Sequence, residues 1–272
     1  MNINEKLKMI SRDLSDIEKT IVTKSDKKPP SKEKLLSFMD GVKAVLFPSF
    51  YLSSQDLDIY ELYVKTAELI SNAHDFYGIP EAEKSEEVAL KYFLSLSEIK
   101  RMLINDATAI YRSDPAAASL SEIYICYPGF YAITFYRVAH SLYLLNVPCI
   151  PRMICEMAHE RTGIDIHPGA TIGDFFAIDH GTGIVIGETA VIGSNVRIYQ
   201  GVTIGAKTVD CITDREATEN KKRHPTIMDD VIIYANATIL GGETVIGKNA
   251  VIGGNVWITH SVSEGEKIYY KK

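Results

Sequence analysis

The chain has 272 residues, 46% of them hydrophobic and 24% charged, so it is long enough for one or two globular domains and too apolar to be wholly disordered. Its formal net charge of -6 gives no basis for binding nucleic acid or an acidic membrane surface. The four cysteines show no Cys-x-x-Cys spacing, and the amino terminus has no signal-peptide core, so we expect a cytoplasmic protein with reduced thiols. The sequence has no long apolar run, so we expect no membrane span.

Residues 1–162 predict an all-helical amino-terminal domain. The first fifty residues are weakly apolar and contain Lys27-Lys28-Pro29-Pro30, which predicts a separate helical pair on a hinge. Apolar spacing and stop signals predict helices from Leu57 to about Ile70, Ser85 to Tyr111, Pro128 to Leu145 and Arg152 to Arg161, with Ser119 and Glu122 in the form of a capping box. We expect this domain to make subunit contacts, because its helices have apolar faces that need cover.

Between residues 164 and 258 the sequence repeats every six residues. The repeat is marked by Ile172-Gly173, Ile186-Gly187, Ile192-Gly193, Ile204-Gly205, Ile246-Gly247 and Ile252-Gly253, with Ile166, Ile178, Ile198, Ile227, Ile233, Ile239 and Ile258 in the same register. This period fits neither an α-helix nor a simple alternating strand, and it is typical of a parallel β-helix. The sequence therefore predicts an α+β protein: helices over 1–162, a β-helix over 163–261 and a short polar tail over 262–272.

The period fails at three places, and these are where we expect binding loops. Ile178 and Ile186 are eight residues apart, Ile204 and Ile227 are twenty-three apart, and Ile239 and Ile246 are seven apart. The longest break contains a charged insertion from Lys207 to His224, which we interpret as a solvated flap.

The first break contains Asp179 and His180, with Asp179 in the position where regular repeats place glycine. The register puts Asp165 on the adjacent coil near the same edge. A carboxylate that binds one imidazole nitrogen fixes the tautomer and leaves the other nitrogen free as a base. We therefore interpret His180 as a general base and Asp165 as the acid that orients it.

Three motifs together resemble those of the serine O-acetyltransferases, a family of hexapeptide-repeat acyltransferases. They are Asp165-Ile-His167-Pro168, Asp179-His180-Gly-Thr-Gly-Ile-Val-Ile-Gly-Glu188-Thr-Ala and Arg223-His224-Pro225, and Asp114-Pro115 resembles the family's Asp-Pro after a long helix. The resemblance covers most of the chain and implies a left-handed β-helix with three strands per coil, in a homotrimer or a dimer of trimers. It implies acetyl transfer from acetyl-CoA to L-serine, giving O-acetyl-L-serine and CoA in cysteine biosynthesis, with L-cysteine as a feedback inhibitor.

The resemblance also assigns roles to residues. His180 is the implied base and Asp165 its partner; the implied serine-binding residues are Asp114, Asp179, Arg223 and His224, with Glu188 in support; and the cofactor-binding candidates are Gly205, Ala206, Ala235 and Lys248. Carboxylates suit the ammonium of serine, and the arginine fork suits its carboxylate. No cysteine falls within the motifs, so we expect direct transfer in a ternary complex, without an acyl-enzyme and without a metal ion.

The chain departs from the family pattern at three points. The family's Gly-Gly-Thr corresponds to Gly205-Ala206-Lys207, the insertion that follows is longer, and the carboxyl end is Tyr269-Tyr270-Lys271-Lys272. Members that dock into O-acetylserine sulfhydrylase end in isoleucine, so the sequence does not support that partnership for this chain.

Three rival functions stay open at this point. An acetyltransferase of the same fold acting on a sugar or antibiotic hydroxyl would use the same base without needing Asp114 and Arg223. A β-helical carbonic anhydrase would need a zinc site, which the spacing of His167, His180 and His224 does not supply convincingly. A non-catalytic trimeric scaffold would not need His180 or Asp165.

Overall fold

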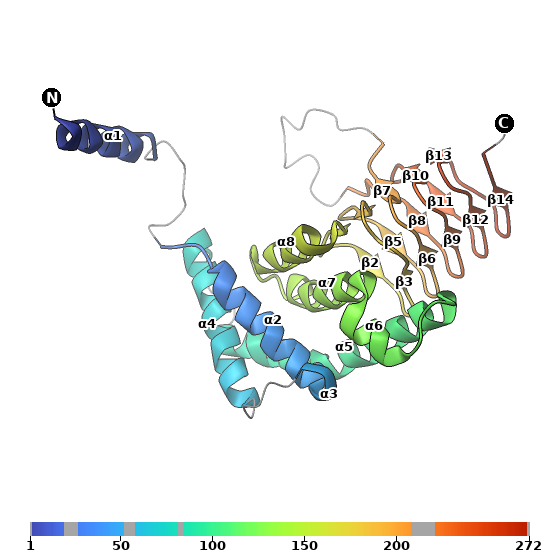
Figure 1. Cartoon of the computed structure of the whole chain (residues 1–272), viewed down its shortest axis with the longest axis horizontal. Helices are drawn as coiled ribbons and strands as arrows, with labels where there is room; N and C mark the ends of the chain where they lie inside the picture. Colours follow the sequence, from blue (N-terminus) through green and yellow to red (C-terminus); the bar gives the residue numbers. More distant parts are fainter. Residues whose placement is uncertain (1, 19–26, 52–57, 81–83, 208–220, 271–272) are drawn as a thin grey trace.

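The computed structural model describes residues 2–18, 27–51, 58–80, 84–207 and 221–270 (Figure 1). Most of the charged insertion (208–220) and the last two lysines lie outside these residues, as does Leu57, the predicted start of a helix. The helices are α1 (Ile3–Glu18), α2 (Lys32–Leu46), α3 (Pro48–Tyr51), α4 (Ile59–Tyr77), α5 (Ser85–Ser113), α6 (Leu120–Cys126), α7 (Pro128–Leu144) and α8 (Ile150–Thr162). Among the described residues, no helix is both long and apolar enough to cross a bilayer.

Local interactions define the helix ends, and they confirm the predicted capping box at Ser119 and Glu122. The Asp58 side chain accepts a bond of 2.8 Å from the Tyr60 N–H at the start of α4, and Gly78 ends that helix in the left-handed region at φ 59°. At α6 the Ser119 hydroxyl oxygen accepts from the Glu122 N–H at 3.2 Å, while Glu122 accepts from the Ala118 N–H at 2.7 Å.

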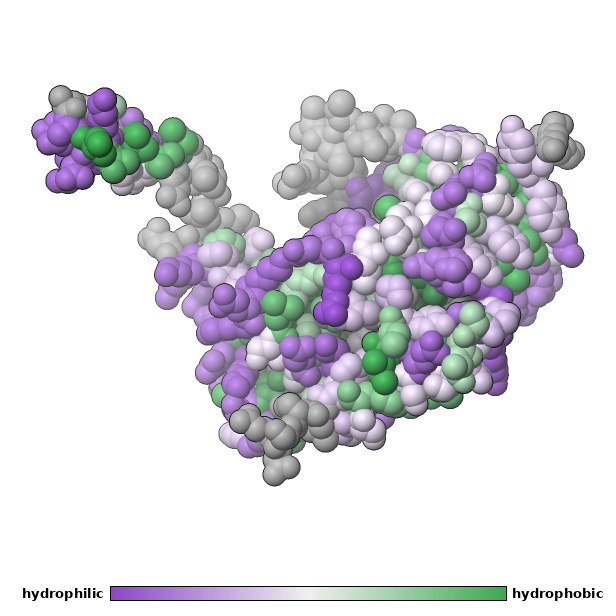
Figure 2. Space-filling model, in the orientation of Figure 1, coloured by the Kyte–Doolittle hydropathy of each residue, from purple (hydrophilic) through white to green (hydrophobic). Residues whose placement is uncertain are grey.

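Helix α2 belongs to the helical core, in contrast to the separate pair expected from the sequence. Leu35, Met39 and Val42 of α2 are fully buried, and α2 packs against α4 and α8. Among the described helices, α1 alone projects away from the others (Figure 1), and Figure 2 shows apolar side chains at its surface. Leu7 and Leu14 of α1 are exposed.

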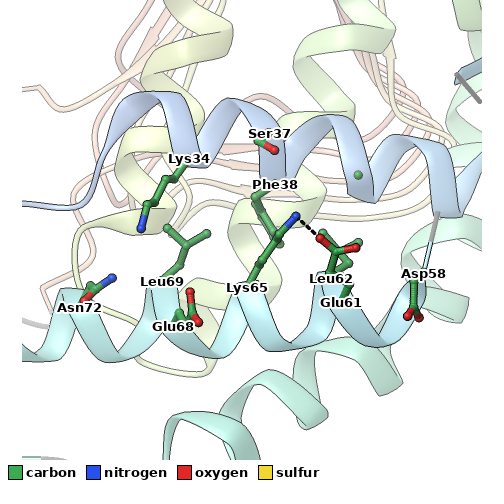
Figure 3. A pocket seen from close by; sticks show the side chains of 11 residues that line it. Lys34, Ser37, Phe38, Asp58, Glu61, Leu62, Lys65, Glu68, Leu69 and Asn72 are labelled. Carbon is green, nitrogen blue, oxygen red and sulfur yellow. Dashed lines mark ion pairs between the residues drawn. The ribbon is translucent and has the colours of Figure 1, made fainter. Parts of the chain in front are cut away.

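A cavity of about 300 Å³ lies between α2 and α4 (Figure 3). Phe38 and Leu69 form part of its apolar lining, and the ion pair between Lys65 and Glu61 lies at its rim. None of the site residues predicted from the sequence lines this cavity, so we look for the chemistry elsewhere.

Two-residue and three-residue strands form a left-handed parallel β-helix with three sheets. Sheet A contains β1 (Asp165–Ile166), β4 (Val185–Ile186), β7 (Thr203–Gly205), β10 (Thr238–Leu240) and β13 (Trp257–Ile258). Sheet B contains β2 (Thr171–Ile172), β5 (Val191–Ile192), β8 (Thr226–Ile227) and β11 (Val245–Ile246). Sheet C contains β3 (Ala177–Ile178), β6 (Arg197–Ile198), β9 (Ile232–Ile233), β12 (Val251–Ile252) and β14 (Lys267–Ile268).

The predicted register is confirmed, because the isoleucines of successive coils are paired within each sheet. In sheet A, Ile166 pairs with Ile186, Ile186 with Ile204, and Ile204 with Ile239, and all four side chains are buried. Each such side chain contributes roughly 1.5–3 kcal/mol relative to an exposed one. The apolar stack therefore holds the coils in register.

The solenoid continues beyond residue 261, into the segment expected to be a tail. Val262 is buried and bridges to Ile246, and β14 pairs with β12. The last described coil therefore covers the end of the apolar core.

The helical domain is fixed to the first coil by packing and by a buried ion pair. Gly129 of α7 lies so close to β3 that a Cβ there would be 2.5 Å from the Ile178 carbonyl oxygen. Asp106 of α5 accepts hydrogen bonds of 3.0 and 3.1 Å from Arg137 of α7, whose other contacts reach the carbonyl of Ile172 at 2.6 Å. This clamp sets the position of the end of α5 relative to the solenoid.

Candidate active site

His180 lies at the corner where the chain passes from sheet C to sheet A. We call this corner, with Asp179, Asp114, Tyr127 and Tyr199, the His180 corner. His180 adopts φ 60°, and the Gly181 N–H donates a 2.7 Å hydrogen bond to the Asp179 carbonyl across it. This is a γ-turn with a positive central φ, a rare and strained conformation for a residue other than glycine. The two extra residues of the break thus lift the imidazole out of the coil, and its side chain is 68% exposed.

Two acidic groups, Asp179 and Asp114, lie near the imidazole at this corner. The Nδ1 atom of His180 lies 3.7 Å from an Asp179 carboxylate oxygen. Asp114, at the end of α5, accepts hydrogen bonds from the Tyr127 hydroxyl at 2.6 Å and from the Ala116 N–H at 2.8 Å. These bonds, the Tyr127 bond first, lower the pKa of the Asp114 carboxyl, while the same contact raises the pKa of Tyr127 to about 12. The corner therefore offers an anionic carboxylate beside an accessible imidazole.

A second group lies at the corner between sheets A and B, where the insertion returns to the solenoid. We call this group, with His167, Glu188, Thr189, Arg223 and His224, the Arg223 corner. Arg223 forms an ion pair with Glu188, and the Tyr143 hydroxyl donates to the other oxygen of Glu188 at 3.4 Å. The Arg223 side chain is 30% exposed, so solvent still reaches part of it.

Two neutral imidazoles stand at the Arg223 corner. The Nδ1 atom of His167 accepts from the Gly169 N–H at 3.0 Å, and the Nδ1 atom of His224 accepts from the Thr189 N–H at 3.1 Å. Both rings must therefore carry their proton on Nε2. Burial lowers the pKa of His167, and burial followed by the Arg223 charge lowers the pKa of His224 to about 4. Besides the Glu188 carboxylate that pairs with Arg223, the corner thus offers N–H donors suited to an anion.

Asp165 lies on the outer face of sheet A, between the two corners. Its carboxylate is 3.7 Å from the Arg152 guanidinium, and no hydrogen bond or ion pair joins it to His180 within the described part of the chain. The coils do place them near each other, because the Gly183 N–H donates to the Gly163 carbonyl at 2.8 Å. The pairing of Asp165 with His180 therefore stays a prediction.

No family model matches the chain. The plasmid-encoded serine acetyltransferase of Synechococcus elongatus is 45% identical over 260 residues, which are 88% of this chain and 81% of that protein. The crystal structure of serine acetyltransferase 1 from Entamoeba histolytica in complex with L-cysteine is 35% identical, covers 90% of this chain and 89% of that one, and has a TM-score of 0.73. A serine acetyltransferase structure in complex with CoA is 27% identical, covers 86% of this chain and 96% of that one, and has a TM-score of 0.57.

The chain belongs to the serine acetyltransferase family. This membership decides against the rival functions of a sugar acetyltransferase, a carbonic anhydrase and a scaffold, which the sequence left open.

The structure distributes the candidate cofactor residues over all three corners of the solenoid. Gly205, the last residue of β7, and Ala206 lie at the corner between sheets A and B, one coil beyond Glu188. Ala235 follows β9, at the corner between sheets C and A. Lys248 lies at the third corner, between sheets B and C, where its ammonium is 3.6 Å from Asp230. Gly205 and Ala206 thus lie at the same edge of sheet A as the Arg223 corner, Ala235 lies at the same edge as the His180 corner, and Lys248 lies at neither.

One group of described residues has metal-ligand chemistry. Glu156, His159 and Asp165 have ligand atoms within 4.8 Å of one another. Arg152 forms ion pairs with both carboxylates of this group, so its positive charge occupies the place that a cation would take. We interpret the group as an ion-pair network.

Sequence reasoning did not assign a role to Tyr127, Thr189 or His167. Tyr127 reaches Asp114 across the short helix α6, a contact without a local sequence signal. His167 follows an inward isoleucine in the position where regular repeats place glycine; this signal is visible in the sequence, but it did not lead to a role. Thr189 lies inside a matched motif, but only the structure reveals its contacts with residues 222–224.

Proposed function

We propose that the protein catalyses acetyl transfer from acetyl-CoA to the hydroxyl of L-serine, giving O-acetyl-L-serine and CoA. The observation that carries the proposal is the division of charge between the corners. The His180 corner offers carboxylates for an ammonium and a base for a hydroxyl, and the Arg223 corner offers donors for a carboxylate. L-Serine has these three groups on adjacent carbon atoms.

The two corners are opposite edges of sheet A in one chain, so we propose that the complete site forms between subunits. In a homotrimer, the His180 corner of one solenoid can face the Arg223 corner of the next. The same arrangement would place Ala235 of one subunit beside the Gly205 and Ala206 segment of its neighbour, along a groove for acetyl-CoA. A dimer of such trimers, formed through the helical domains, would contain the same site.

In this site Asp114 and Asp179 bind the serine ammonium, while Arg223 and His224 bind its carboxylate. His180 removes the hydroxyl proton as the oxygen attacks the thioester carbonyl, since an imidazole near neutral pKa is suited to this transfer. The tetrahedral intermediate then collapses, the C–S bond breaks, and the proton passes from His180 to the departing CoA thiolate. Asp165 is the proposed carboxylate that orients His180, from the neighbouring coil or from the adjacent subunit.

Direct transfer in a ternary complex is supported by the positions of the described cysteines. Cys126 lies at the end of α6, Cys149 precedes α8, and Cys155 is buried within α8, where burial raises the pKa of its thiol. None of them belongs to either site corner. We also propose a cytoplasmic location, supported by the absence of paired cysteine spacing in the sequence.

The test is thiol release from acetyl-CoA with L-serine, with and without L-cysteine, which shares the ammonium and carboxylate of serine and should compete. His180→Asn should lower kcat by about 10²- to 10⁴-fold while the protein remains folded. Comparison of Asp165→Asn with Asp179→Asn separates the roles of the two carboxylates: the first should lower kcat, and the second should raise the KM for serine. Unchanged turnover in His180→Asn, or acetylation of sugars but not of serine, would refute the proposal.

A further inference from the structure

Thr189 is at the centre of a hydrogen-bond network that holds the segment carrying Arg223 and His224. Its hydroxyl oxygen accepts the backbone N–H groups of Arg223 at 2.9 Å and His224 at 3.1 Å. Its carbonyl oxygen accepts from the Lys222 ammonium at 2.7 Å. Three consecutive residues at the end of the insertion are therefore tied to one residue of the preceding coil.

The same threonine also determines which nitrogen of His224 bears the proton. The Thr189 hydroxyl lies 2.8 Å from His224 Nδ1, and the Thr189 backbone N–H lies 3.1 Å from the same atom. A backbone N–H can only donate, so Nδ1 is an acceptor. Because the hydroxyl oxygen already accepts two N–H groups, its own proton is directed to Nδ1 as well.

The packing around the ring also restricts its position. A Cβ on Gly187 would be 2.0 Å from His224 Cδ2 and 2.1 Å from Nε2, so the imidazole packs directly on the backbone of Gly187. A Cβ on Gly242 would be 2.2 Å from the Lys222 carbonyl oxygen, so the segment is also held from the other side. The ring is thus fixed both by its hydrogen bonds and by its packing.

We propose that Thr189 is a positioning residue for substrate recognition: it holds His224 as a neutral Nε2–H donor, beside the Arg223 guanidinium, for the α-carboxylate of the amino-acid substrate. This inference rests on the proposed function. Burial and the adjacent Arg223 charge lower the pKa of His224, which agrees with a ring that stays neutral while it donates. Thr189 itself does not touch the reacting atoms, so its loss should weaken serine binding more than turnover.

The experiment compares Thr189→Val, which keeps the shape without the hydroxyl, with Thr189→Ser, which keeps the hydroxyl. Thr171→Val is the matched control, since Thr171 is an exposed strand threonine on sheet B. In Thr189→Val the KM for L-serine and the inhibition constant of L-cysteine should rise together, on the order of tenfold. The KM for acetyl-CoA should stay the same, and kcat should change less than threefold. Thr189→Ser and Thr171→Val should behave as the unaltered protein does.

If the unaltered protein does not acetylate serine, the proposed function is refuted. If the unaltered protein is active and Thr189→Val leaves the KM for serine unchanged, only the role of Thr189 is refuted. If Thr189→Val does not fold, the unaltered protein labelled with ¹⁵N-histidine still gives an answer. Two-bond ¹H–¹⁵N spectra, assigned with His224→Gln, should show a proton on Nε2 of His224 and none on Nδ1. A proton on Nδ1 would overturn the inference.

Discussion

The ion pair between Asp106 and Arg137 is predicted to carry much of the attachment between the helical domain and the β-helix. Both side chains are almost completely inaccessible, at 0% and 3% exposure. Asp106 also accepts the Phe176 N–H at 2.9 Å, and Arg137 also donates to the carbonyls of Ile172 and Gly173 at 2.6 Å each. Removing the carboxylate would leave a buried guanidinium with only part of its partners.

The expected loss of stability follows from the burial of the ion pair. Asp106→Ala should lower the free energy of unfolding by about 3–5 kcal/mol, because it leaves an uncompensated buried charge. The control is the exposed pair of Arg101 and Asp174, which joins the same helix to the same coil at 49% and 25% exposure. Arg101→Met should cost about 0–1 kcal/mol, because solvent screens an exposed pair.

The assay is thermal unfolding at one fixed protein concentration, followed by kinetics well below the midpoint. At roughly 2–4 °C per kcal/mol for a chain of this size, Asp106→Ala should lower the midpoint by about 6–20 °C, and Arg101→Met by less than about 4 °C. Asp106 lies two helical turns before Asp114 on α5, so the serine KM should also rise in Asp106→Ala. Equal midpoint changes in the two variants would refute the argument from burial.

Three further predictions concern the two corners. Tyr127→Phe removes the principal hydrogen bond to Asp114, so the pKa of Asp114 should rise and the serine KM should increase about three- to tenfold, measured against an unchanged KM for acetyl-CoA. Gly187→Ala should push the His224 ring aside, lower the free energy of unfolding by about 1–3 kcal/mol in a denaturant titration and raise the KM for serine. An unchanged free energy of unfolding together with an unchanged KM for serine would contradict the close contact between Gly187 and His224. The pKa of His224 is lowered to about 4 in the folded protein, so on acidification the unfolded chain binds the proton first. The neutral His224 ring therefore contributes its full stabilisation of the folded state above about pH 6.5, and this contribution is lost as the pH falls towards 4. The urea midpoint should therefore fall between pH 7 and pH 4.5, and His224→Gln should reduce this fall.

The solenoid was predictable because its information is local and repeated. An inward isoleucine at every sixth position specifies strand, corner and register together, and the observed pairing of Ile166 with Ile186 follows from counting alone. Helix ends were predictable for the same reason, since Gly78 and Ser119 act within a few residues of their own position. The end of the solenoid was harder, because β14 has no glycine after its isoleucine and only its pairing with β12 identifies it as a strand.

The candidate site residues could be selected from the sequence, but their arrangement could not. The broken period draws attention to His180, but it does not reveal the γ-turn that exposes the side chain. The partner of Asp114 is thirteen positions away at Tyr127, and that of Asp106 is thirty-one away at Arg137; no periodicity encodes either contact. Nor does the sequence reveal that one face of α2 is buried, because that face becomes part of the core only by packing against α4 and α8.

A regular coil of this solenoid leaves little capacity for chemistry. Its isoleucines face an apolar core, and its backbone groups are paired with the coils above and below. Reactive side chains therefore have to enter at corners where the winding is interrupted, and both corners show such an interruption: two extra residues at His180 and a long insertion before Arg223. Each interruption is then secured by neighbouring groups, the first by Tyr127 on Asp114 and the second by Thr189 on His224. Since the two secured corners lie on opposite edges of one sheet and have complementary charge, assembly of adjacent solenoids is the step that would bring a base, an ammonium site and a carboxylate site within reach of one amino acid.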